Sequence, residues 1–398
     1  MEILAPAGNL EKLKLAINYG ADAVYVGLQK FGLRSAAENF NLDELQEGVE
    51  FAHSKGSKVY VVLNAYLHDS ELEELILFLA EMESRAIDAV IVSDLGVVRT
   101  VKENSSIPVH LSTQASCLNV ESARLWKRMG AERLVLGREV SIEEASRIKK
   151  EVEIEIELFI HGSMCMAFSG NCVISNYTQG RDSNRGGCAH SCRFKYELEI
   201  PTEDKKITES SFFMSSKDLN GLSMLPKFIE HEIDSLKIEG RMKNHLYVAT
   251  VSKVYSDALR QYNENKEISN LDELESNLNK LSNREYTQAS LDKPAGYNSV
   301  NRTREKAHNS HAILGKTVTN KKKSDDYIFV QTKAKALLNQ RIEVLDSEGP
   351  VCFSTIDRIE DTVGNDVQQT KPNRIYKLYS TQLIGQSFQK NNVLRIGL

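Results

Sequence analysis

Four cysteines stand close together near the middle of the chain, at Cys165, Cys172, Cys188 and Cys192. The chain has only six cysteines, and four of them lie within 28 residues, so they form a cluster in the sequence. Four thiolates gathered around one centre can hold an iron–sulfur cluster or a zinc ion. The stretch between them is rich in glycine and asparagine, which lets the backbone bend tightly enough to present four sulfurs together.

The spacing of these cysteines favours an iron–sulfur cluster, with zinc as the alternative. Structural zinc sites commonly use cysteine pairs two residues apart, and no such pair occurs here. The N-terminus does not resemble a secretory signal peptide, so we expect a cytoplasmic protein, in whose reducing surroundings disulfides are disfavoured. Cys117 and Cys352 stand apart from the four and are expected to be small buried apolar residues.

Composition narrows the classes of function. A chain of 398 residues, 41% hydrophobic and 26% charged, suits a large globular domain with a smaller one. No apolar run reaches the roughly 20 residues that span a bilayer, so we expect no membrane partner. The net charge of −5 gives no global attraction to nucleic acid, so RNA contact would need local basic patches. Candidate patches are Arg181, Arg185, Arg193 and Lys195 beside the cysteines, Lys237, Arg241 and Lys243, and Lys321, Lys322 and Lys323.

The first 260 residues alternate short apolar strands with amphipathic helices. Continuous β-branched runs are typical of parallel strands that are covered on both faces. About eight such units favour a (β/α)8 TIM-like barrel, and the lack of Gly-x-Gly-x-x-Gly after the first strand counts against a dinucleotide-binding sheet. The expected strands are residues 3–5, 23–26, 59–63, 89–92, 109–111, 134–136, 156–160 and 235–238.

We expect three parts in the chain. Residues 1–265 form the barrel, with a cysteine-rich insertion at about 161–215 after strand 7, in which residues 194–200 and 211–214 make a hairpin. Residues 266–308 are polar and read as a linker, and residues 309–398 read as a small β-barrel. Barrel enzymes carry their active sites at the C-terminal ends of the strands, where this insertion begins.

Polar residues recur at nearly every expected strand end, which predicts a polar pocket at that face of the barrel. His161 is a candidate base, although a packing histidine is an equal alternative. A thiol–imidazole pair between His161 and Cys165, as in a cysteine peptidase, also stays open. The candidate catalytic residues are His161, Glu239 and Arg138, and the candidate binding residues are Asn64, Gln114, Arg181, Lys237 and Arg241.

Several short motifs carry a family resemblance. They are ILAPAG at 3–8, GADAVY at 20–25, FGLR at 31–34, LSTQ at 111–114, FIHG at 159–162, SKDL at 216–219 and KIEGRMK at 237–243. With the four cysteines, these motifs resemble the collagenase-like peptidase family, peptidase family U32, across residues 1 to about 260. The segment NREYT at 283–287 departs from the Gly-Phe pair that is usual in that family.

The resemblance implies a function that differs from the family's name. Members are implied to be oxygen-independent hydroxylation proteins, and the branch with this architecture makes 5-hydroxyuridine at the wobble position of tRNA. It implies a [4Fe–4S] cluster on Cys165, Cys172, Cys188 and Cys192, dependence on prephenate, and a separate electron donor. A small dicarboxylate of this kind needs cationic partners, for which Arg181, Lys237 and Arg241 are candidates.

Four alternatives stay open beside this function. One is a collagenase-like peptidase, as the family name states. Two others are hydroxylation of ribosomal RNA and hydroxylation of a quinone precursor, which are activities of other branches of the family. The fourth is a non-catalytic, cluster-bearing scaffold that presents RNA to a partner.

Overall fold

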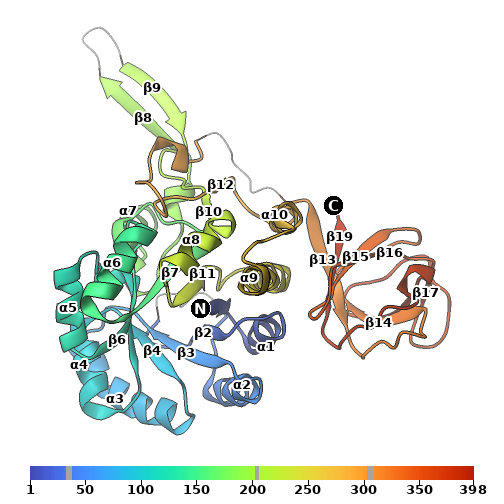
Figure 1. Ribbon diagram of the computed structural model, residues 1–398. Coiled ribbons are helices and arrows are strands. Elements are labelled where there is room, and N and C mark those ends of the chain that lie inside the picture. Colours follow the sequence, from blue (N-terminus) through green and yellow to red (C-terminus); the bar gives the residue numbers. More distant parts are fainter. Residues whose placement is uncertain (33–37, 202–205, 303–308) are drawn as a thin grey trace.

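Eight parallel strands close into a barrel in the computed structural model, which describes residues 1–32, 38–201, 206–302 and 309–398 (Figure 1). Closure is complete because β11 pairs with β1 on one side and with β7 on the other. All eight strands lie where the apolar runs predicted them, so the barrel prediction is confirmed. They are β1 (Glu2–Ala7), β2 (Ala23–Gly27), β3 (Lys58–Leu63), β4 (Ala89–Val92), β5 (Val109–Leu111), β6 (Ala131–Val135), β7 (Glu155–Ser163) and β11 (Ser235–Ile238).

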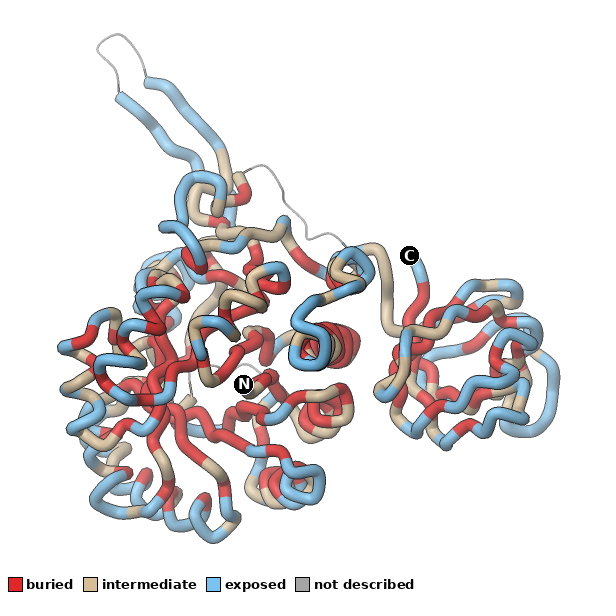
Figure 2. The backbone as a smooth tube through the Cα atoms, in the orientation of Figure 1, coloured by how far each residue is buried: buried red, intermediate tan, exposed pale blue. Residues whose placement is uncertain are grey.

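Helices surround the barrel and cover the outer face of its strands, which are buried almost throughout (Figure 2). Local capping fixes where several helices begin: the Asn9 side chain accepts from Lys12 N, and Ser141 and Glu144 form a capping box. None of the described helices is long and apolar enough to cross a membrane. The helices are α1 (Leu10–Asn18), α2 (Leu42–Ser54), α3 (Asp69–Ser84), α4 (Leu95–Asn104), α5 (Val120–Arg128), α6 (Ile142–Val152), α8 (Leu225–Glu230) and α9 (His245–Asn265).

The insertion after β7 departs from a regular barrel. The end of β7 pairs antiparallel with β10 (Asp218–Asn220), and β10 pairs in turn with β12 (Tyr286–Thr287). Between β7 and β10 lie the short helix α7 (Ile174–Gln179) and a hairpin of β8 (Tyr196–Pro201) and β9 (Lys206–Ser211), which projects away from the barrel (Figure 1). The second hairpin strand was predicted at 211–214, but Phe212 N instead donates to Arg302 O at 3.4 Å.

The segment expected as a linker contributes to the barrel's packing. Residues 266–302 include helix α10 (Leu271–Asn279) as well as β12. Leu274, Leu278, Leu281 and Leu291 are buried in the hydrophobic core of the barrel. Within α10, Leu274 and Leu278 are four residues apart and lie on one buried face, although the charged and amide residues between them make the segment polar in composition.

The C-terminal domain is a seven-stranded antiparallel sheet curled around its own hydrophobic core (Figures 1 and 2). Sheet order is β16–β15–β19–β13–β14–β18–β17. This arrangement agrees with the small β-barrel that the strand pattern predicted. The strands are β13 (His311–Thr317), β14 (Tyr327–Thr332), β15 (Arg341–Leu345), β16 (Cys352–Thr355), β17 (Arg358–Glu360), β18 (Ile375–Tyr379) and β19 (Val393–Gly397).

A buried tyrosine joins the two domains. The Tyr19 hydroxyl donates to Leu345 O at 2.7 Å and accepts from Val393 N at 2.8 Å. Leu345 and Val393 pack in the same apolar cluster as the barrel's helices. Lys316 also forms an ion pair with Glu11 of α1. The β domain is therefore docked on the outside of α1 and α9 by apolar, hydrogen-bonded and ionic contacts together.

Candidate active-site cavity

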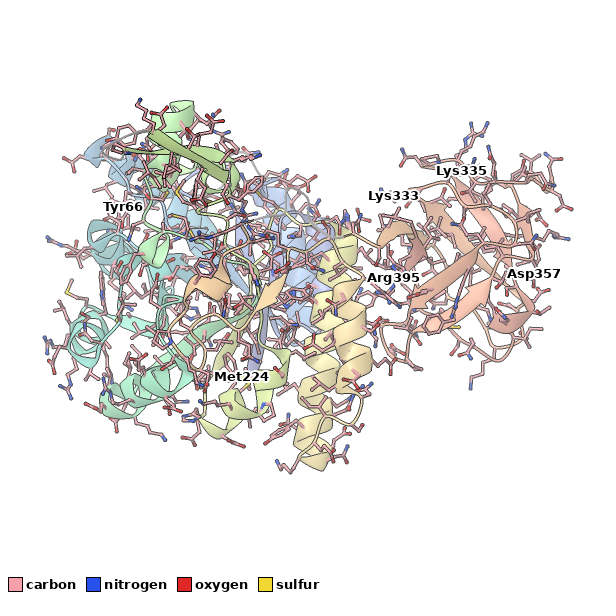
Figure 3. The ribbon with its side chains drawn as sticks, turned by 90° about the horizontal axis from the view of Figure 1, so that it is seen from above. Tyr66, Met224, Lys333, Lys335, Asp357 and Arg395 are labelled. Atoms are coloured by element: carbon pink, nitrogen blue, oxygen red, sulfur yellow. The ribbon has the colours of Figure 1, made fainter. Side chains whose placement is uncertain are left out.

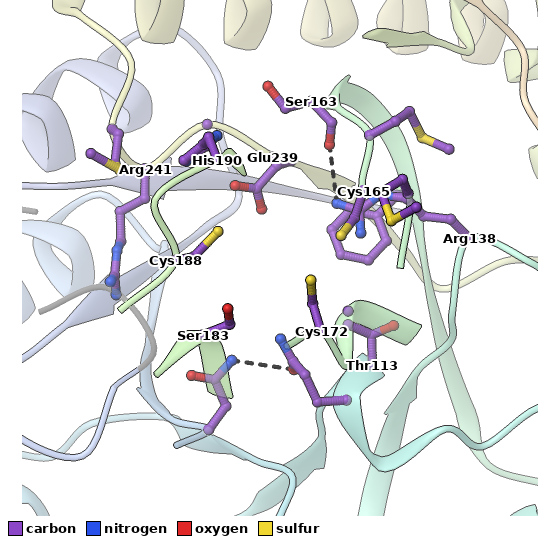
Figure 4. Close-up of a pocket in the computed structure, with 18 of the residues that line it drawn as sticks. Thr113, Arg138, Ser163, Cys165, Cys172, Ser183, Cys188, His190, Glu239 and Arg241 are labelled. Carbon is purple, nitrogen blue, oxygen red and sulfur yellow. Dashed lines mark hydrogen bonds between the residues drawn. The ribbon is translucent and has the colours of Figure 1, made fainter. Parts of the chain in front are cut away.

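A cavity of about 280 Å³ opens at the C-terminal ends of the barrel strands, where the sequence placed the pocket (Figure 4). Strand ends supply one part of its wall, and the cysteine-rich insertion supplies the other. The barrel contributes Tyr25, Asn64, Gln114, Arg138, Phe159, Lys237, Glu239 and Arg241, and the insertion contributes Cys165, Cys172, Cys188 and Cys192 among others.

All four clustered cysteines line this one cavity. Figure 4 shows the thiols of Cys165, Cys172 and Cys188 pointing toward a common space. Burial raises the pKa of the Cys192 thiol; the neighbouring Arg193 charge opposes this rise, and the other three cysteines add to it. Among the described residues, no group of three or more His, Cys, Asp or Glu is placed to hold a single metal ion. The four cysteines therefore share one cavity, without forming a single-ion site among the described residues.

The cysteine segment is tied to the barrel by Arg185. Its Nη2 contacts both carboxylate oxygens of Glu71 at 2.9 and 3.0 Å, and its Nη1 donates to Tyr66 O. The neighbouring Asn184 Oδ1 accepts from Cys172 N at 3.2 Å. Arg185 was predicted as part of a basic patch, but its guanidinium N–H groups already bind Glu71 and Tyr66 O and so hold the cysteine-rich insertion in place.

Two cavity cations differ in what they already bind. The guanidinium of Arg138 lies over the Phe159 ring and donates to Ser163 O at 3.3 Å, and it pairs with no carboxylate in the described part of the chain. Lys237 Nζ lies 2.6 Å from Oε1 of Glu157, whose side chain is fully buried. The positive charge of Lys237 is therefore largely neutralised before any ligand arrives, whereas that of Arg138 is not.

Close backbone approach at glycines positions Arg241 and Glu239. A Cβ atom at Gly27 would lie 1.9 Å from Nη1 of Arg241, so only glycine leaves room for the guanidinium there. Gly162 has φ +110°, and a Cβ atom there would lie 2.1 Å from Glu239 O. These contacts seat the loop after β11 against β2 and β7, so both side chains line the cavity.

A phenol and a pair of amides complete the polar wall. Tyr25 Oη lies 3.5 Å from Oε2 of Glu239, and burial, reinforced by that carboxylate, raises the pKa of Tyr25 well above its usual value. Asn64 Nδ2 donates to Gln114 Oε1 at 3.3 Å, and Gln114 O accepts from Asn171 Nδ2 at 3.3 Å. Tyr25 and Phe159 were missed from the sequence because both belong to buried strands that read as ordinary core.

The structure does not bring His161 to the cavity. Its side chain is 1% exposed and is surrounded by Tyr247, Tyr255 and Tyr286, with Nδ1 3.2 Å from the Tyr255 hydroxyl. Burial lowers the pKa of His161 to about 3, so the imidazole is neutral. His161 is therefore a packing histidine and not a base, and it forms no thiol–imidazole pair with Cys165.

One candidate binding residue lies away from the cavity lining. Arg181 is exposed on the cysteine segment and does not line the cavity. Arg34, in the FGLR motif, lies outside the described residues. Arg138, Glu239, Lys237, Arg241, Asn64 and Gln114 do line the cavity together, although they come from strands far apart in the sequence.

Comparison with known proteins places this architecture in a family. Residues 8–301, which contain every cavity residue named above, match the model of Peptidase family U32. The chain belongs to this family. The match covers nearly all of the barrel with its cysteine insertion and stops before the β domain.

Named relatives of this U32 chain divide between RNA hydroxylation and proteolysis. Over its whole length the chain is 38% identical to "tRNA hydroxylation protein P1" of Bacillus subtilis (strain 168), of which it covers 94%. It is 36% identical over 65% of its length to "23S rRNA 5-hydroxycytidine C2501 synthase" of Escherichia coli (strain K12), covering 39% of that protein. It is 32% identical to "Collagenase" of Porphyromonas gingivalis (strain ATCC BAA-308 / W83), covering 66% of each chain.

Proposed function

We propose that this chain is an RNA-modifying enzyme that hydroxylates tRNA, forming 5-hydroxyuridine at the wobble position without molecular oxygen. The observation that carries the proposal is the meeting of four thiols and an unneutralised arginine in one cavity at the catalytic end of the barrel. The similarity to "tRNA hydroxylation protein P1" extends through the β domain, whereas the similarity to the ribosomal RNA synthase covers 65% of the chain. That difference favours tRNA as the substrate.

We propose that Cys165, Cys172, Cys188 and Cys192 hold a [4Fe–4S] cluster. A single zinc ion requires all its sulfurs about 2.3 Å from one point, whereas a four-iron cube takes one thiolate at each corner and needs a wider ring. The observation that supports the proposal is that all four thiols line one cavity, as ligands of a shared cluster must. When bound, the cluster would supply redox-active iron beside the substrate, and a separate electron donor would serve it.

The remaining cavity residues have roles that follow from their contacts. Arg138 and Arg241 would bind a small dicarboxylate such as prephenate, because planar guanidinium groups match carboxylates in two-point contacts. Asn64 and Gln114 present amides, which are suited to the polar edge of an extruded base. Glu239 is the carboxylate on this wall and would accept a proton from the reacting substrate.

The thiol–imidazole pair that the sequence suggested for proteolysis is not assembled. A cysteine peptidase needs an imidazole beside its thiol, but His161 is enclosed by three tyrosines while Cys165 lines the cavity. His190 also lines the cavity beside the cysteines, so the gelatin-cleavage assay described below is the test of proteolysis.

Mass spectrometry of nucleosides from a strain that lacks the gene tests the proposal. We expect 5-hydroxyuridine and its derivatives to disappear from tRNA and to return with the wild-type gene, while hydroxylated nucleosides of ribosomal RNA and the quinone pool stay unchanged. Loss confined to ribosomal RNA or to quinones would transfer the activity to that substrate. Gelatin cleavage by the purified protein, with tRNA nucleosides unchanged, would support a collagenase instead.

The scaffold alternative needs a separate test. Purified protein, with its cluster, prephenate and a chemical electron acceptor, should hydroxylate tRNA without any second protein, because replacing C5–H by C5–OH with oxygen from water releases two electrons that the acceptor must take up. Activity that appears only when another polypeptide is added would assign catalysis to that partner.

A further inference from the structure

Exposed aromatic rings gather around the cysteine-rich insertion. Among the described residues, five phenylalanines and tyrosines are exposed, namely Phe168, Tyr177, Phe194, Tyr297 and Phe353. The first three belong to the insertion, and Tyr297 lies at the foot of its hairpin. Rings of this size are usually well buried because they carry a large apolar area. Four exposed rings at one end of the barrel therefore indicate an interaction surface.

Phe168 and Tyr177 lie beside the mouth of the cysteine cavity. Phe168 stands between Met166 and Gly170, which both line the cavity, and Met166 is itself exposed. Tyr177 follows Ile174, another lining residue, by one turn of α7 and is 87% exposed. Residues three apart on a helix lie on the same face, so Tyr177 lies next to the opening. Both rings therefore flank the entrance to the cavity.

The barrel holds the segment that carries these two rings. Tyr66, labelled in Figure 3, donates from its hydroxyl to Asn171 Oδ1 at 3.2 Å. Its backbone nitrogen donates to Asn184 O at 3.4 Å. Side chains on a segment that is already fixed lose less freedom when they bind a ligand, so the cost of ordering them is small.

Phe194 and Tyr297 extend the surface to the foot of the β8–β9 hairpin. Phe194 directly follows Arg193, which lines the cavity. The guanidinium carbon of Arg302 lies 4.3 Å from the centre of the Tyr297 ring. The carbonyl oxygen of Arg302 accepts from Phe212 N, directly after β9. Tyr297 and its stacked cation are thus held where the hairpin leaves the barrel.

The charge of the insertion changes sign between this surface and the hairpin. Residues 165–195 contain four arginines and lysines and one acidic residue, giving +3. Residues 196–211, which include the hairpin, contain two lysines and five acidic residues, giving −3. Arg181 and Lys195 are exposed and form no ion pair in the part of the chain that the structure describes. A polyanion is therefore attracted to the rings near the cavity and repelled by the hairpin.

We propose that Phe168, Tyr177, Phe194 and Tyr297 bind single-stranded RNA by stacking on the bases that flank the nucleotide in the cysteine cavity. The inference rests on the proposed action on tRNA and adds the form of the substrate, an unpaired loop. A base that enters a pocket leaves its stack, so its neighbours offer free faces. Aromatic side chains cover such faces with little regard to sequence, while nearby cations hold the backbone.

Binding of short RNA to the full chain, purified with its cluster, tests this surface apart from the chemistry. The probe is a fluorescein-labelled single strand of about ten nucleotides, compared by anisotropy with the same strand annealed to its complement. We expect the single strand to bind more tightly, because paired bases cannot stack on the protein. Tyr177→Ala and Phe168→Ala should each weaken its binding by about fivefold or more. The loss should be equal at two salt concentrations, since stacking releases no counterions.

Two further substitutions are matched controls. Tyr177→Phe keeps the ring and should keep the affinity. Phe353→Ala removes an exposed ring from the β domain, outside this surface, and should have no effect on the short strand. Because Tyr177 is almost fully exposed, its replacement by alanine should leave urea denaturation unchanged, which separates lost stacking from lost folding.

The outcomes distinguish this surface from the proposed reaction. Equal affinities for single strand and duplex would overturn the stacking proposal, as would wild-type affinity in both alanine variants. Absence of RNA binding would also overturn it and leave these rings to a protein partner. Ring-dependent binding by a protein whose gene deletion leaves tRNA nucleosides unchanged would support the surface and refute the hydroxylation alone.

Discussion

The guanidinium carbon of Arg138 lies 3.8 Å from the centre of the Phe159 ring. Stacking on an aromatic face holds a guanidinium flat and leaves its edge of N–H donors available. One of these donors reaches Ser163 O at 3.3 Å. Lys237, on the same cavity wall, is instead bonded to Glu157. Of these two cations, Arg138 is the one prepared to receive an anion.

Arg138→Met should therefore weaken binding of a small dicarboxylate at least tenfold, because it removes a charge-assisted hydrogen bond worth about 1.5–3 kcal/mol. The methionine still packs on Phe159, so the free energy of unfolding should change by less than about 1 kcal/mol. Equilibrium dialysis with prephenate measures the first quantity and urea denaturation the second. Arg138→Lys should restore only part of the affinity. Wild-type affinity in Arg138→Met would contradict the assignment.

Lys237 and Glu157 should behave as a buried ion pair in stability measurements. Lys237→Met leaves Glu157 buried with Arg133, 3.4 Å from its other oxygen, as its one cation among the described residues, and should destabilise the protein by about 3 kcal/mol. Lys237→Met combined with Glu157→Met should recover most of that loss, since no charge is then stranded. Urea denaturation of the three variants measures the coupling. Simple addition of the two single losses would show that the pair is not coupled.

The buried imidazole of His161 should make the protein sensitive to acid. Its pKa of about 3 in the folded state lies below the ordinary value of 6.5, so the unfolded chain binds one more proton between these pH values. The stability contribution is present above about pH 6.5 and is lost as the pH falls toward 3. From pH 7 to pH 5, His161→Gln should lose about 2 kcal/mol less unfolding free energy than wild type. Equal losses in urea denaturation would rule out this contribution.

Iron content tests the cluster directly. Anaerobically purified protein should be brown and contain about four irons per chain. Changing any one of Cys165, Cys172, Cys188 or Cys192 to serine should bleach the protein and lower its iron content. Cys117→Ser and Cys352→Ser are the controls and should retain full iron. Stoichiometric zinc without iron in the wild type would favour the zinc alternative.

Under the proposed function, salt dependence should identify which domain binds the RNA backbone. Residues 309–398 contain 13 lysines and arginines and nine acidic residues, giving +4, while the rest of the chain carries −9. Lys322 and Lys323 are exposed on this domain. Replacing both with alanine should weaken tRNA binding and reduce the slope of log affinity against log salt by about 2. Lys55→Ala, an exposed change on the barrel, is the control, and equal slopes in all three proteins would exclude this surface.

Much of the barrel could be predicted because its strands are short, continuous apolar runs. The cavity could be predicted in part because strand ends in a barrel meet at one face, which brings Asn64, Gln114, Arg138 and Glu239 together. The environment of each side chain could not be predicted. Contacts with residues distant in the sequence decide it, as the three tyrosines around His161 show.

Lys321 illustrates the same limit within the β domain. It stands in a triplet of lysines that reads as a solvated basic patch. In the structure it is 5% exposed, and its ammonium donates to Lys322 O at 2.9 Å and to Gln386 O at 2.8 Å. Composition gives the charge of a segment. Only the folded chain shows which ammonium groups already donate to backbone carbonyl oxygens.

The double hydrogen bond of the Tyr19 hydroxyl has a consequence for substrate selection under the proposed function. One phenol fastens two strands of the β domain to the first helix of the barrel, so the separation between the domain's basic face and the cysteine cavity is fixed. Under the proposed function, the distance between the two domains would then select the nucleotide to be modified. A tRNA bound by its backbone to the β domain would present to the cavity only the nucleotide that lies at this distance, whatever the sequence between the two points.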